Sequence, residues 1–180
     1  IGDDEGKSST ANALLFDKES GLLSLLNSQS TDGELPIYIT LSPKEYFVLP
    51  ANYKGGSITV FSQDKKGKLQ RDTKIIRFAG NGPNKNRQDK SHLHCVTFTP
   101  DGKFLLATDL GTDCIYLFPI GKRPEAGKAH SLLDESRVVR IQMDSGPGPR
   151  HICFHPNGRF AYLISELSGK ITVFSYNEGK

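Results

Sequence analysis

Short apolar runs alternate with turn-forming residues along this chain, and the alternation recurs at a nearly constant spacing. Residues 41–61, 98–118 and 154–174 align with one another without a gap. A proline marks the same place in each copy, at Pro43, Pro100 and Pro156. The prolines stand 57 and 56 residues apart, and a phenylalanine follows each of them 18 residues later. A recurrence of this length indicates that one structural unit is repeated along the chain.

Each copy of the repeat is predicted to hold three β-strands joined by tight turns. Asparagine or aspartate followed by glycine separates the first apolar run from the second in two of the copies. Such a pair is typical of hairpin turns, because glycine readily adopts the positive φ that these turns require. The predicted strands are residues 37–41, 47–51 and 58–61 in the first copy, 94–98, 104–108 and 115–118 in the second, and 150–154, 160–164 and 171–174 in the third.

Weaker apolar stretches after the third strand predict a fourth strand at the outer edge of each unit. They lie at residues 75–78 and 138–141, and an arginine interrupts each of them. Charged residues are expected in a strand that pairs on one side only. The N-terminal part fits the same pattern, with a third strand predicted at residues 13–16 and a fourth at 22–26.

Four antiparallel strands in every repeat predict an all-β fold, a β-propeller of four-stranded antiparallel blades. The chain of 180 residues is expected to form an incomplete arc of that ring. Its open ends would leave apolar sheet faces uncovered, and the remaining blades of the same propeller are expected to cover them. The expected division is residues 1–30 for the outer strands of one blade, 36–85 for a second blade, 91–145 for a third, and 149–180 for the inner strands of a fourth.

Composition and charge argue against several classes of function. The net charge is +3 with the two signs interspersed, which is unlike proteins that bind nucleic acid or an anionic membrane surface. No apolar stretch approaches the ~20 residues of a membrane-spanning helix. The cysteines lie within apolar runs and are expected to be buried free thiols in a reducing compartment, the cytoplasm; they are Cys95, Cys114 and Cys153. The chain opens on isoleucine rather than methionine, so its natural start, and any signal peptide, is expected upstream.

Two columns of the aligned repeats carry polar residues where packing alone would call for apolar ones. Six positions before the proline, at the start of the innermost strand, the copies hold Ile37, His94 and Arg150. Ten positions after the proline, where the second strand ends, they hold Tyr53, Leu110 and Glu166. The second strand of an antiparallel hairpin ends beside the start of the first. His94, Arg150 and Glu166 are therefore predicted to meet at one mouth of the central channel.

The period exceeds that of WD40 repeats and the chain contains no tryptophan, which argues against a WD40 propeller. Several motifs instead resemble the lactonase family of seven-bladed propellers, to which 6-phosphogluconolactonases and carboxy-muconate cyclases belong. The motifs are Pro50-Ala-Asn-Tyr-Lys-Gly-Gly56, Ser91-His-Leu-His-Cys-Val96, Ala107-Thr-Asp-Leu-Gly-Thr-Asp113, Gly146-Pro-Gly-Pro-Arg-His-Ile-Cys-Phe-His-Pro156 and Ser165-Glu-Leu167. Two positions depart from the family pattern, since Leu93 replaces a proline between two histidines and Ser165 replaces an asparagine.

The resemblance implies about three of seven blades and a lactonase that needs no cofactor. The reaction it favours is hydrolysis of a sugar lactone, 6-phosphogluconolactone, to 6-phosphogluconate. A lactone-forming cyclase of the muconate type and a non-catalytic binding propeller are the alternatives, because a fold alone implies no activity. In the resemblance, His94, Arg150 and Glu166 match the positions proposed for catalysis in the cyclase branch.

Opening a lactone needs an activated water, a stabilised oxyanion and a proton for the departing alkoxide. Either Glu166 or His94 is expected to act as the general base, and Arg150 to hold the oxyanion or an anionic group of the substrate. His92 and His151 are candidates for substrate binding, although both also fit structural roles. An ion pair that only holds the blade's hairpin together is the alternative for Arg150 and Glu166.

Other polar residues near the motifs are expected to be structural. No cysteine or carboxylate completes a metal site with His92 and His94, so no metal is expected. Asp109 and Asp113 flank a glycine turn and are expected to cap backbone N–H groups. The loop before the histidines is expected to face solvent, or alternatively to attract an anionic substrate, through Lys85, Arg87 and Lys90.

Overall fold

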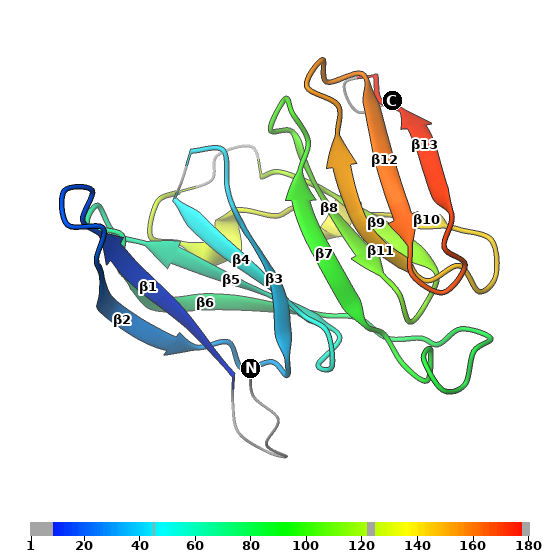
Figure 1. Cartoon of the computed structure of the whole chain (residues 1–180), viewed down its shortest axis with the longest axis horizontal. Helices are drawn as coiled ribbons and strands as arrows, with labels where there is room; N and C mark the ends of the chain where they lie inside the picture. The colour runs from blue at the N-terminus through cyan, green and yellow to red at the C-terminus, as the bar shows by residue number, and fades with distance from the viewer. Residues whose placement is uncertain (1–8, 45, 122–124, 178–180) are drawn as a thin grey trace.

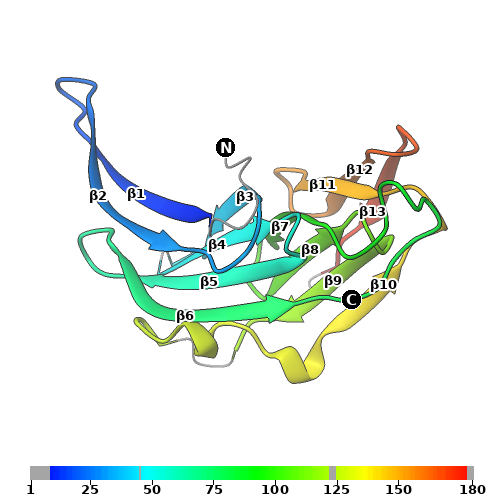
Figure 2. The same cartoon turned by 90° about the horizontal axis from the view of Figure 1, so that it is seen from below.

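The structure of the chain, a computed structural model, describes residues 9–44, 46–121 and 125–177. These residues form an all-β fold of antiparallel sheets, with two short 3-10 segments, η1 (Ala129–Ser131) and η2 (Glu135–Arg137), in one long connection. The sheets follow one another around an arc in the order of the chain (Figures 1 and 2). The predicted all-β propeller architecture is confirmed. The ends of the first and last predicted blades, residues 1–8 and 178–180, lie outside the described residues.

Within every sheet, strands that are neighbours in sequence pair antiparallel, and in the second, third and fourth sheets the first strand is the innermost. The first sheet contains β1 (Thr10–Phe16) and β2 (Leu23–Ser30). The second contains β3 (Pro36–Leu41), β4 (Phe47–Asn52), β5 (Ser57–Gln63) and β6 (Leu69–Arg77). The third contains β7 (Leu93–Phe98), β8 (Phe104–Asp109), β9 (Cys114–Pro119) and β10 (Val139–Gln142), and the fourth β11 (Pro149–Phe154), β12 (Phe160–Ser165) and β13 (Ile171–Ser175).

The outer strand of the second sheet is longer than the sequence pattern predicted. It begins at Leu69 rather than at residue 75, because a tight turn reverses the chain directly after β5. In that turn the Asp64 carboxylate accepts hydrogen bonds from the backbone N–H groups of Lys66 and Lys68, and Gly67 takes a φ of 82°. Pairing therefore starts immediately, between Gln63 and Leu69. Charged residues interrupt the apolar pattern in the first part of β6, so the apolar runs predicted only its last part.

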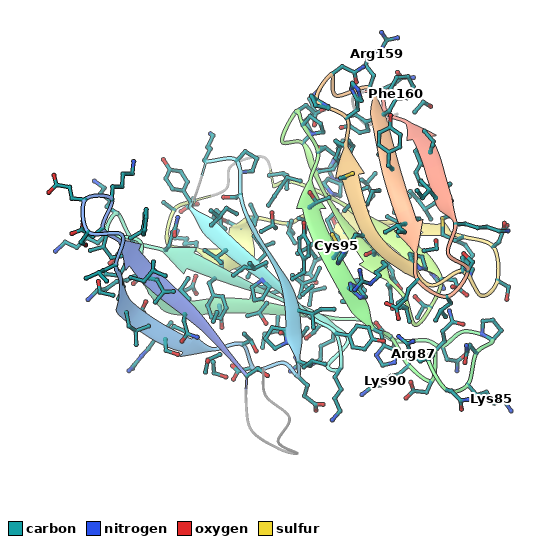
Figure 3. The ribbon with its side chains drawn as sticks, in the orientation of Figure 1. Lys85, Arg87, Lys90, Cys95, Arg159 and Phe160 are labelled. Carbon is teal, nitrogen blue, oxygen red and sulfur yellow. The ribbon has the colours of Figure 1, made fainter. Side chains whose placement is uncertain are left out.

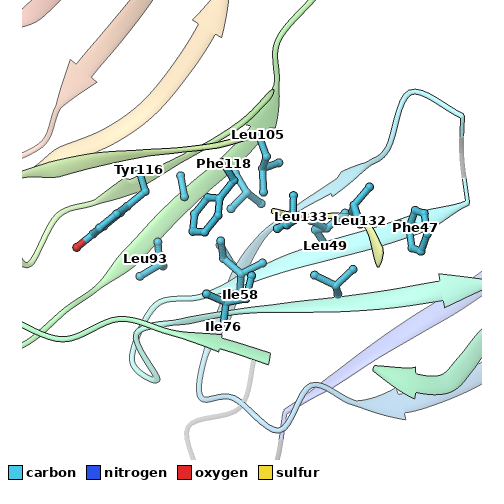
Figure 4. Packing of buried hydrophobic residues seen from close by; sticks show 14 of the residues in the cluster. Phe47, Leu49, Ile58, Ile76, Leu93, Leu105, Tyr116, Phe118, Leu132 and Leu133 are labelled. Atoms are coloured by element: carbon cyan, nitrogen blue, oxygen red, sulfur yellow. The ribbon is translucent and has the colours of Figure 1, made fainter. Parts of the chain in front are cut away.

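The cores lie between neighbouring sheets, as the face-to-face packing of blades requires. Phe47, Leu49 and Ile58 of the second sheet pack against Leu93 and Phe118 of the third (Figure 4). A second cluster joins the third sheet to the fourth, and includes Cys95, Leu106, Ile115, Ile152, Ala161 and Leu163. This packing sets the inner strands β3, β7 and β11 beside one another. The three strands run in the same direction, so their first residues lie along the same rim of the arc (Figure 1).

The two terminal sheets expose apolar side chains, as expected for an arc with open ends. Leu23 on β2 is 62% exposed, and Ile171 on β13 is 67% exposed. The prediction that all three cysteines are buried is wrong for Cys153, although all three are free thiols. Ile152 faces the third sheet, so Cys153, the next residue along β11, faces the opposite side, where no further sheet lies among the described residues. Within the described ranges, no helix is long and apolar enough to cross a membrane.

Candidate functional site

The side chains of the first polar column leave the inner strands at β-bulges. The register of β7 against β8 shifts between Leu93 and Cys95, so His94 is the additional residue of a bulge. The register of β11 against β12 shifts between Pro149 and His151 in the same way, around Arg150. A bulge redirects the side chain of its additional residue and increases the local twist of the strand. The repeat therefore supplies a backbone position whose side chain is directed away from the regular sheet pattern.

The three residues predicted to be catalytic lie together. Pro149 at the start of β11 pairs with Ser165 at the end of β12, which sets Glu166 beside Arg150. Arg150 Nε donates to Glu166 Oε2 over 3.0 Å, and His94 Nε2 lies 3.5 Å from the same oxygen. The geometric part of the prediction is confirmed, and the catalytic roles of these residues stay predictions.

A fourth member of the cluster, Arg87, comes from the loop between β6 and β7. Its Nη2 donates to Glu166 Oε1, and also to the Tyr53 hydroxyl over 3.4 Å. In Figure 3 Arg87 lies near the start of β7, whereas Lys85 lies at the outer tip of the same loop. Both Lys85 and Lys90 are exposed. Sequence analysis treated the three cations of this loop alike, and the structure separates Arg87 from the two lysines.

Aromatic and imidazole rings surround the ion pairs. The His92 ring stacks on Tyr53 with centroids 4.6 Å apart, and His94 meets Tyr53 edge-on at 5.5 Å. His151 meets His94 edge-on at 4.9 Å, and its Nδ1 lies 3.5 Å from Arg150 Nη1. Both histidines proposed for substrate binding thus belong to the same cluster as the three proposed catalytic residues.

Two buried aspartates hold the backbone that carries these side chains. Asp109 Oδ1 accepts hydrogen bonds from the backbone N–H groups of His92, at 2.7 Å, and Gly111, at 3.0 Å. Asp113 Oδ1 accepts from Gly148 N at 2.9 Å and Oδ2 from Gly146 N at 2.7 Å. The prediction that both aspartates cap backbone N–H groups is confirmed.

Asp113 also reaches the loop that carries Arg87, because Gln88 Nε2 donates to Asp113 Oδ1 over 2.7 Å. Gln88 is fully buried and donates in addition to the Leu110 carbonyl. One carboxylate therefore anchors the segment next to Arg87 and the turn that precedes Arg150.

The charges of the cluster favour an ionised Glu166 and a neutral His94. Burial opposes ionisation of Glu166, but its hydrogen bonds and its attraction to Arg87 and Arg150 hold the pKa of the carboxyl below its usual value. Burial, followed by repulsion from Arg150 and His151, lowers the pKa of His94 to about 4. Burial and Arg150 also lower the pKa of His151. At neutral pH two guanidinium groups thus face the Glu166 carboxylate, while a second carboxylate, Asp89, contacts His92 of the same cluster.

The histidines of the cluster do not form a metal-binding set. His92 Nε2 lies 2.9 Å from Asp89 Oδ1, and its Nδ1 lies 3.2 Å from the Tyr53 carbonyl oxygen, so neither ring nitrogen is directed at a shared ligand position with His94. Among the residues that the structure describes, no group of three or more His, Cys, Asp or Glu side chains is placed to hold a metal ion.

Comparison with known proteins finds relatives that share this fold. The chain is 37% identical to the 6-phosphogluconolactonase of Bacillus subtilis over 167 residues, which are 92% of this chain and 44% of that protein. A solved Bacteroides fragilis structure, provisionally named a 6-phosphogluconolactonase, is 43% identical with a TM-score of 0.88, over 97% of this chain and 49% of its own. The periplasmic gluconolactonase PpgL of Pseudomonas aeruginosa is 29% identical with a TM-score of 0.78, over 98% of this chain and 48% of its own.

These matches cover most of this chain but only part of each relative. The chain spans about half the length of the relatives that it matches. The model of the family described as "Lactonase, 7-bladed beta-propeller" matches residues 2–180, nearly the whole sequence. The chain belongs to the lactonase family of seven-bladed β-propellers.

Proposed function

We propose that the protein to which this chain belongs hydrolyses a sugar lactone, 6-phosphogluconolactone, to 6-phosphogluconate. The observation that carries the proposal is the arrangement around Glu166, whose carboxylate pairs with Arg150 and Arg87 beside a neutral His94. Relatives named 6-phosphogluconolactonase support this choice of substrate, with 37% and 34% identity to this chain.

The proposed reaction is attack of water on the lactone carbonyl carbon. His94 accepts a proton from the water as the new C–O bond forms, a role worth ~10²–10⁴ in rate. Arg150 donates hydrogen bonds to the oxygen that becomes negative in the tetrahedral intermediate. The bond to the ring oxygen then breaks, and the proton returns from His94 to that oxygen, which gives the open-chain hydroxy acid.

Two features favour His94 over Glu166 as the base. Both oxygens of Glu166 accept hydrogen bonds from guanidinium groups, so each is already engaged by a charged donor. His94 is neutral at pH 7, and its Nε2, 3.5 Å from Glu166 Oε2, is the ring nitrogen that faces the cluster. In this scheme Glu166 holds Arg150 and Arg87 in place and His151 binds the substrate, while His92, whose ring nitrogens contact Asp89 and the Tyr53 carbonyl, acts through its stacking on Tyr53.

The test is a hydrolysis assay on the complete natural protein with 6-phosphogluconolactone. His94→Asn is expected to lower kcat by ~10²-fold or more, with little change in the melting temperature. His130 is exposed and lies in η1, so His130→Asn is the matched control and is expected to retain activity.

Other outcomes would assign the alternatives. Lactone formation from a muconate without lactone hydrolysis would indicate a cyclase. Absence of both reactions in the folded protein would favour a binding propeller. A large loss in Glu166→Gln with His94→Asn still active would make Glu166 the base.

The propeller context carries two further proposals. Residues 36–85 and 91–145 are two blades, with residues 1–30 and 149–180 as parts of two more; the sheets β3–β6 and β7–β10 support this division. The protein works in the cytoplasm, a proposal supported by three free cysteines. The P. aeruginosa relative is periplasmic, so fractionation of cells with an antibody to the protein is the direct test.

A further inference from the structure

We propose that Arg87 is the residue that binds the substrate's phosphate and so makes the site prefer a phosphorylated sugar lactone. The inference rests on the proposed lactonase function and adds to it one residue of a loop for which the sequence left two interpretations open, a solvent-facing loop or attraction of an anionic substrate. Three observations support it. Two nitrogens of Arg87 have no hydrogen-bond partner among the described residues, Arg87 contacts the Glu166 oxygen that is not shared with Arg150, and a buried hydrogen bond from the neighbouring Gln88 fixes the loop.

Arg87 has hydrogen-bonding capacity that the described residues do not use. Its contacts with Glu166 and Tyr53 both come from Nη2. Within the described residues, Nε and Nη1 of Arg87 have no hydrogen-bond partner, and the side chain is 44% exposed. A guanidinium group presents its donors in a planar fork that fits phosphate oxygens in pairs. Arg87 is thus held by one nitrogen and offers the others to a ligand.

The two oxygens of Glu166 divide the cluster into two sides. Arg150 and His94 lie at Oε2, and these are the groups proposed to act on the lactone carbonyl. Arg87 and the Tyr53 hydroxyl lie at Oε1. Arg87 therefore stands beside the reacting groups but separated from them by the carboxylate, which suits a substituent away from the carbonyl, such as the phosphate of a phosphorylated sugar lactone.

The position of Arg87 is fixed although its loop has no counterpart in the repeat. The neighbouring Gln88 is buried and donates to Asp113 Oδ1, the same oxygen that accepts from Gly148 N. Asp113 consequently sets the distance between the loop of Arg87 and the bulge of Arg150. A solvated lysine or arginine needs no such hydrogen bond next to it. For a binding residue, the bond reduces the conformational entropy that is lost when the ligand binds.

The electrostatics match a phosphate monoester, which carries a charge of about −1.5 to −2 at pH 7. Glu166 neutralises one of the two guanidinium groups, and His94 contributes no positive charge at this pH. Around Glu166 itself two guanidinium groups face one carboxylate, and this local excess, with the free donors of Arg87, attracts an anion, since the Asp89 carboxylate is engaged with His92.

The experiment compares Arg87→Met, Arg87→Lys and the unsubstituted complete protein on 6-phosphogluconolactone and on unphosphorylated glucono-δ-lactone. Loss of charge-assisted hydrogen bonds is expected to lower kcat/KM for the phosphorylated lactone by about 10- to 100-fold in Arg87→Met, mainly through KM. The loss for glucono-δ-lactone is expected to be about tenfold smaller. Arg87→Lys should recover only part of the loss, because lysine lacks the planar fork. Lys85→Met removes one charge from the exposed tip of the same loop and should change neither substrate by more than about twofold.

Several results would overturn the inference. An equal loss for both lactones, carried by kcat, would show that Arg87 acts only by positioning Glu166. No loss for either lactone would show that Arg87 does not bind the substrate. A loss of the same size in Lys85→Met would show that the effect comes from the overall charge of the loop.

Binding measurements separate this inference from the proposed function. Calorimetric titration of the complete protein with 6-phosphogluconate and with gluconate reports phosphate recognition without any turnover. If the unsubstituted protein hydrolyses neither lactone but binds 6-phosphogluconate more tightly than gluconate, and Arg87→Met abolishes that difference, the lactonase assignment fails and the phosphate site stands. Equal affinity for the two sugar acids in the unsubstituted protein would refute the phosphate site.

Discussion

His94 shows how strongly one side chain depends on its neighbours in this cluster. The side chain is only 7% exposed, and its Nε2 lies 3.5 Å from Glu166 Oε2. Its ring meets the ring of His151 edge-on, and the positive charge of Arg150 lies near it. Desolvation disfavours the charged imidazole most, and the Arg150 charge adds to that effect, so the pKa falls to about 4. His94 therefore stays neutral over the whole range in which a free histidine would change charge.

This depressed pKa predicts how stability changes with pH. An unfolded chain takes up a proton on histidine near pH 6.5, whereas folded His94 takes it up only near pH 4. The stabilising contribution is therefore complete above pH 6.5 and is lost as the pH falls to 4, by about 3 kcal/mol. Urea unfolding at pH 7 and pH 4 should show this component in the unsubstituted protein and not in His94→Gln. An NMR titration that gave a His94 midpoint near 6.5 would contradict the prediction.

The residues of the site differ in how far sequence can predict them. His94, Arg150 and Glu166 occupy fixed places in the repeat, so their approach follows from the geometry of a hairpin and of neighbouring blades. Tyr53 was not predicted to join them, although it occupies the same column as Glu166, and that shared column is the signal that could have found it. Arg87 lies in a loop without a repeat counterpart, and no register relates it to the strands. Its position depends on the long-range bond from Gln88 to Asp113, which no local pattern encodes.

At the scale of single elements, the turn around Asp113 connects two segments that are distant in sequence. Asp113 has a φ of 54°, a conformation that costs a non-glycine residue energy. Its carboxylate is buried and accepts hydrogen bonds from Gln88, Gly146 and Gly148. The strained backbone at this position is offset by three hydrogen bonds, which hold the Arg87 loop and the start of β11.

Asp113→Ala is expected to lower the free energy of unfolding by about 3 kcal/mol, because three donors, two of them buried, lose their acceptor. Activity should fall as well, since both arginine-bearing segments lose a common anchor. Asp32→Ala is the matched control: Asp32 has a similar φ of 46° but is exposed. Denaturant unfolding of both variants separates the hydrogen bonds from the backbone strain. Equal losses in the two variants would show that the three bonds contribute little.

The elements were predictable where the repeat is regular and less so where it is not. Most strands coincide with apolar runs, because each buries a face against a neighbouring sheet. The start of β6 was missed because its outward face is charged, and pairing rather than burial defines it. The bulges at His94 and Arg150 were also not predicted, since the additional residue of a bulge changes the hydrogen-bond register without changing the apolar pattern.

At the scale of the whole molecule, the exposed faces of the first and last sheets predict how this 180-residue chain behaves when produced by itself. Leu14, Phe16 and Leu23 on one side and Ile171 and Val173 on the other are more than half exposed. Contiguous apolar surface and unpaired strand edges promote association. Light scattering after size-exclusion chromatography should find oligomers or aggregates, which Leu23→Lys combined with Ile171→Lys should reduce. A monodisperse monomer that melts cooperatively would contradict this expectation.

The pairing of each strand with its neighbour in sequence also determines the order in which the molecule is assembled during translation. The second sheet can close its hairpins as soon as residue 77 has left the ribosome, before β7 has been made. Glu166 is the last of the site residues to be synthesised, and it reaches Arg150 only when β12 has paired with β11. Until then the nascent chain carries the two guanidinium groups without the carboxylate that they share. The site is therefore completed in the final stage of vectorial folding of this segment, and a stalled chain that ends before β12 would have its inner strands in place and no functional centre.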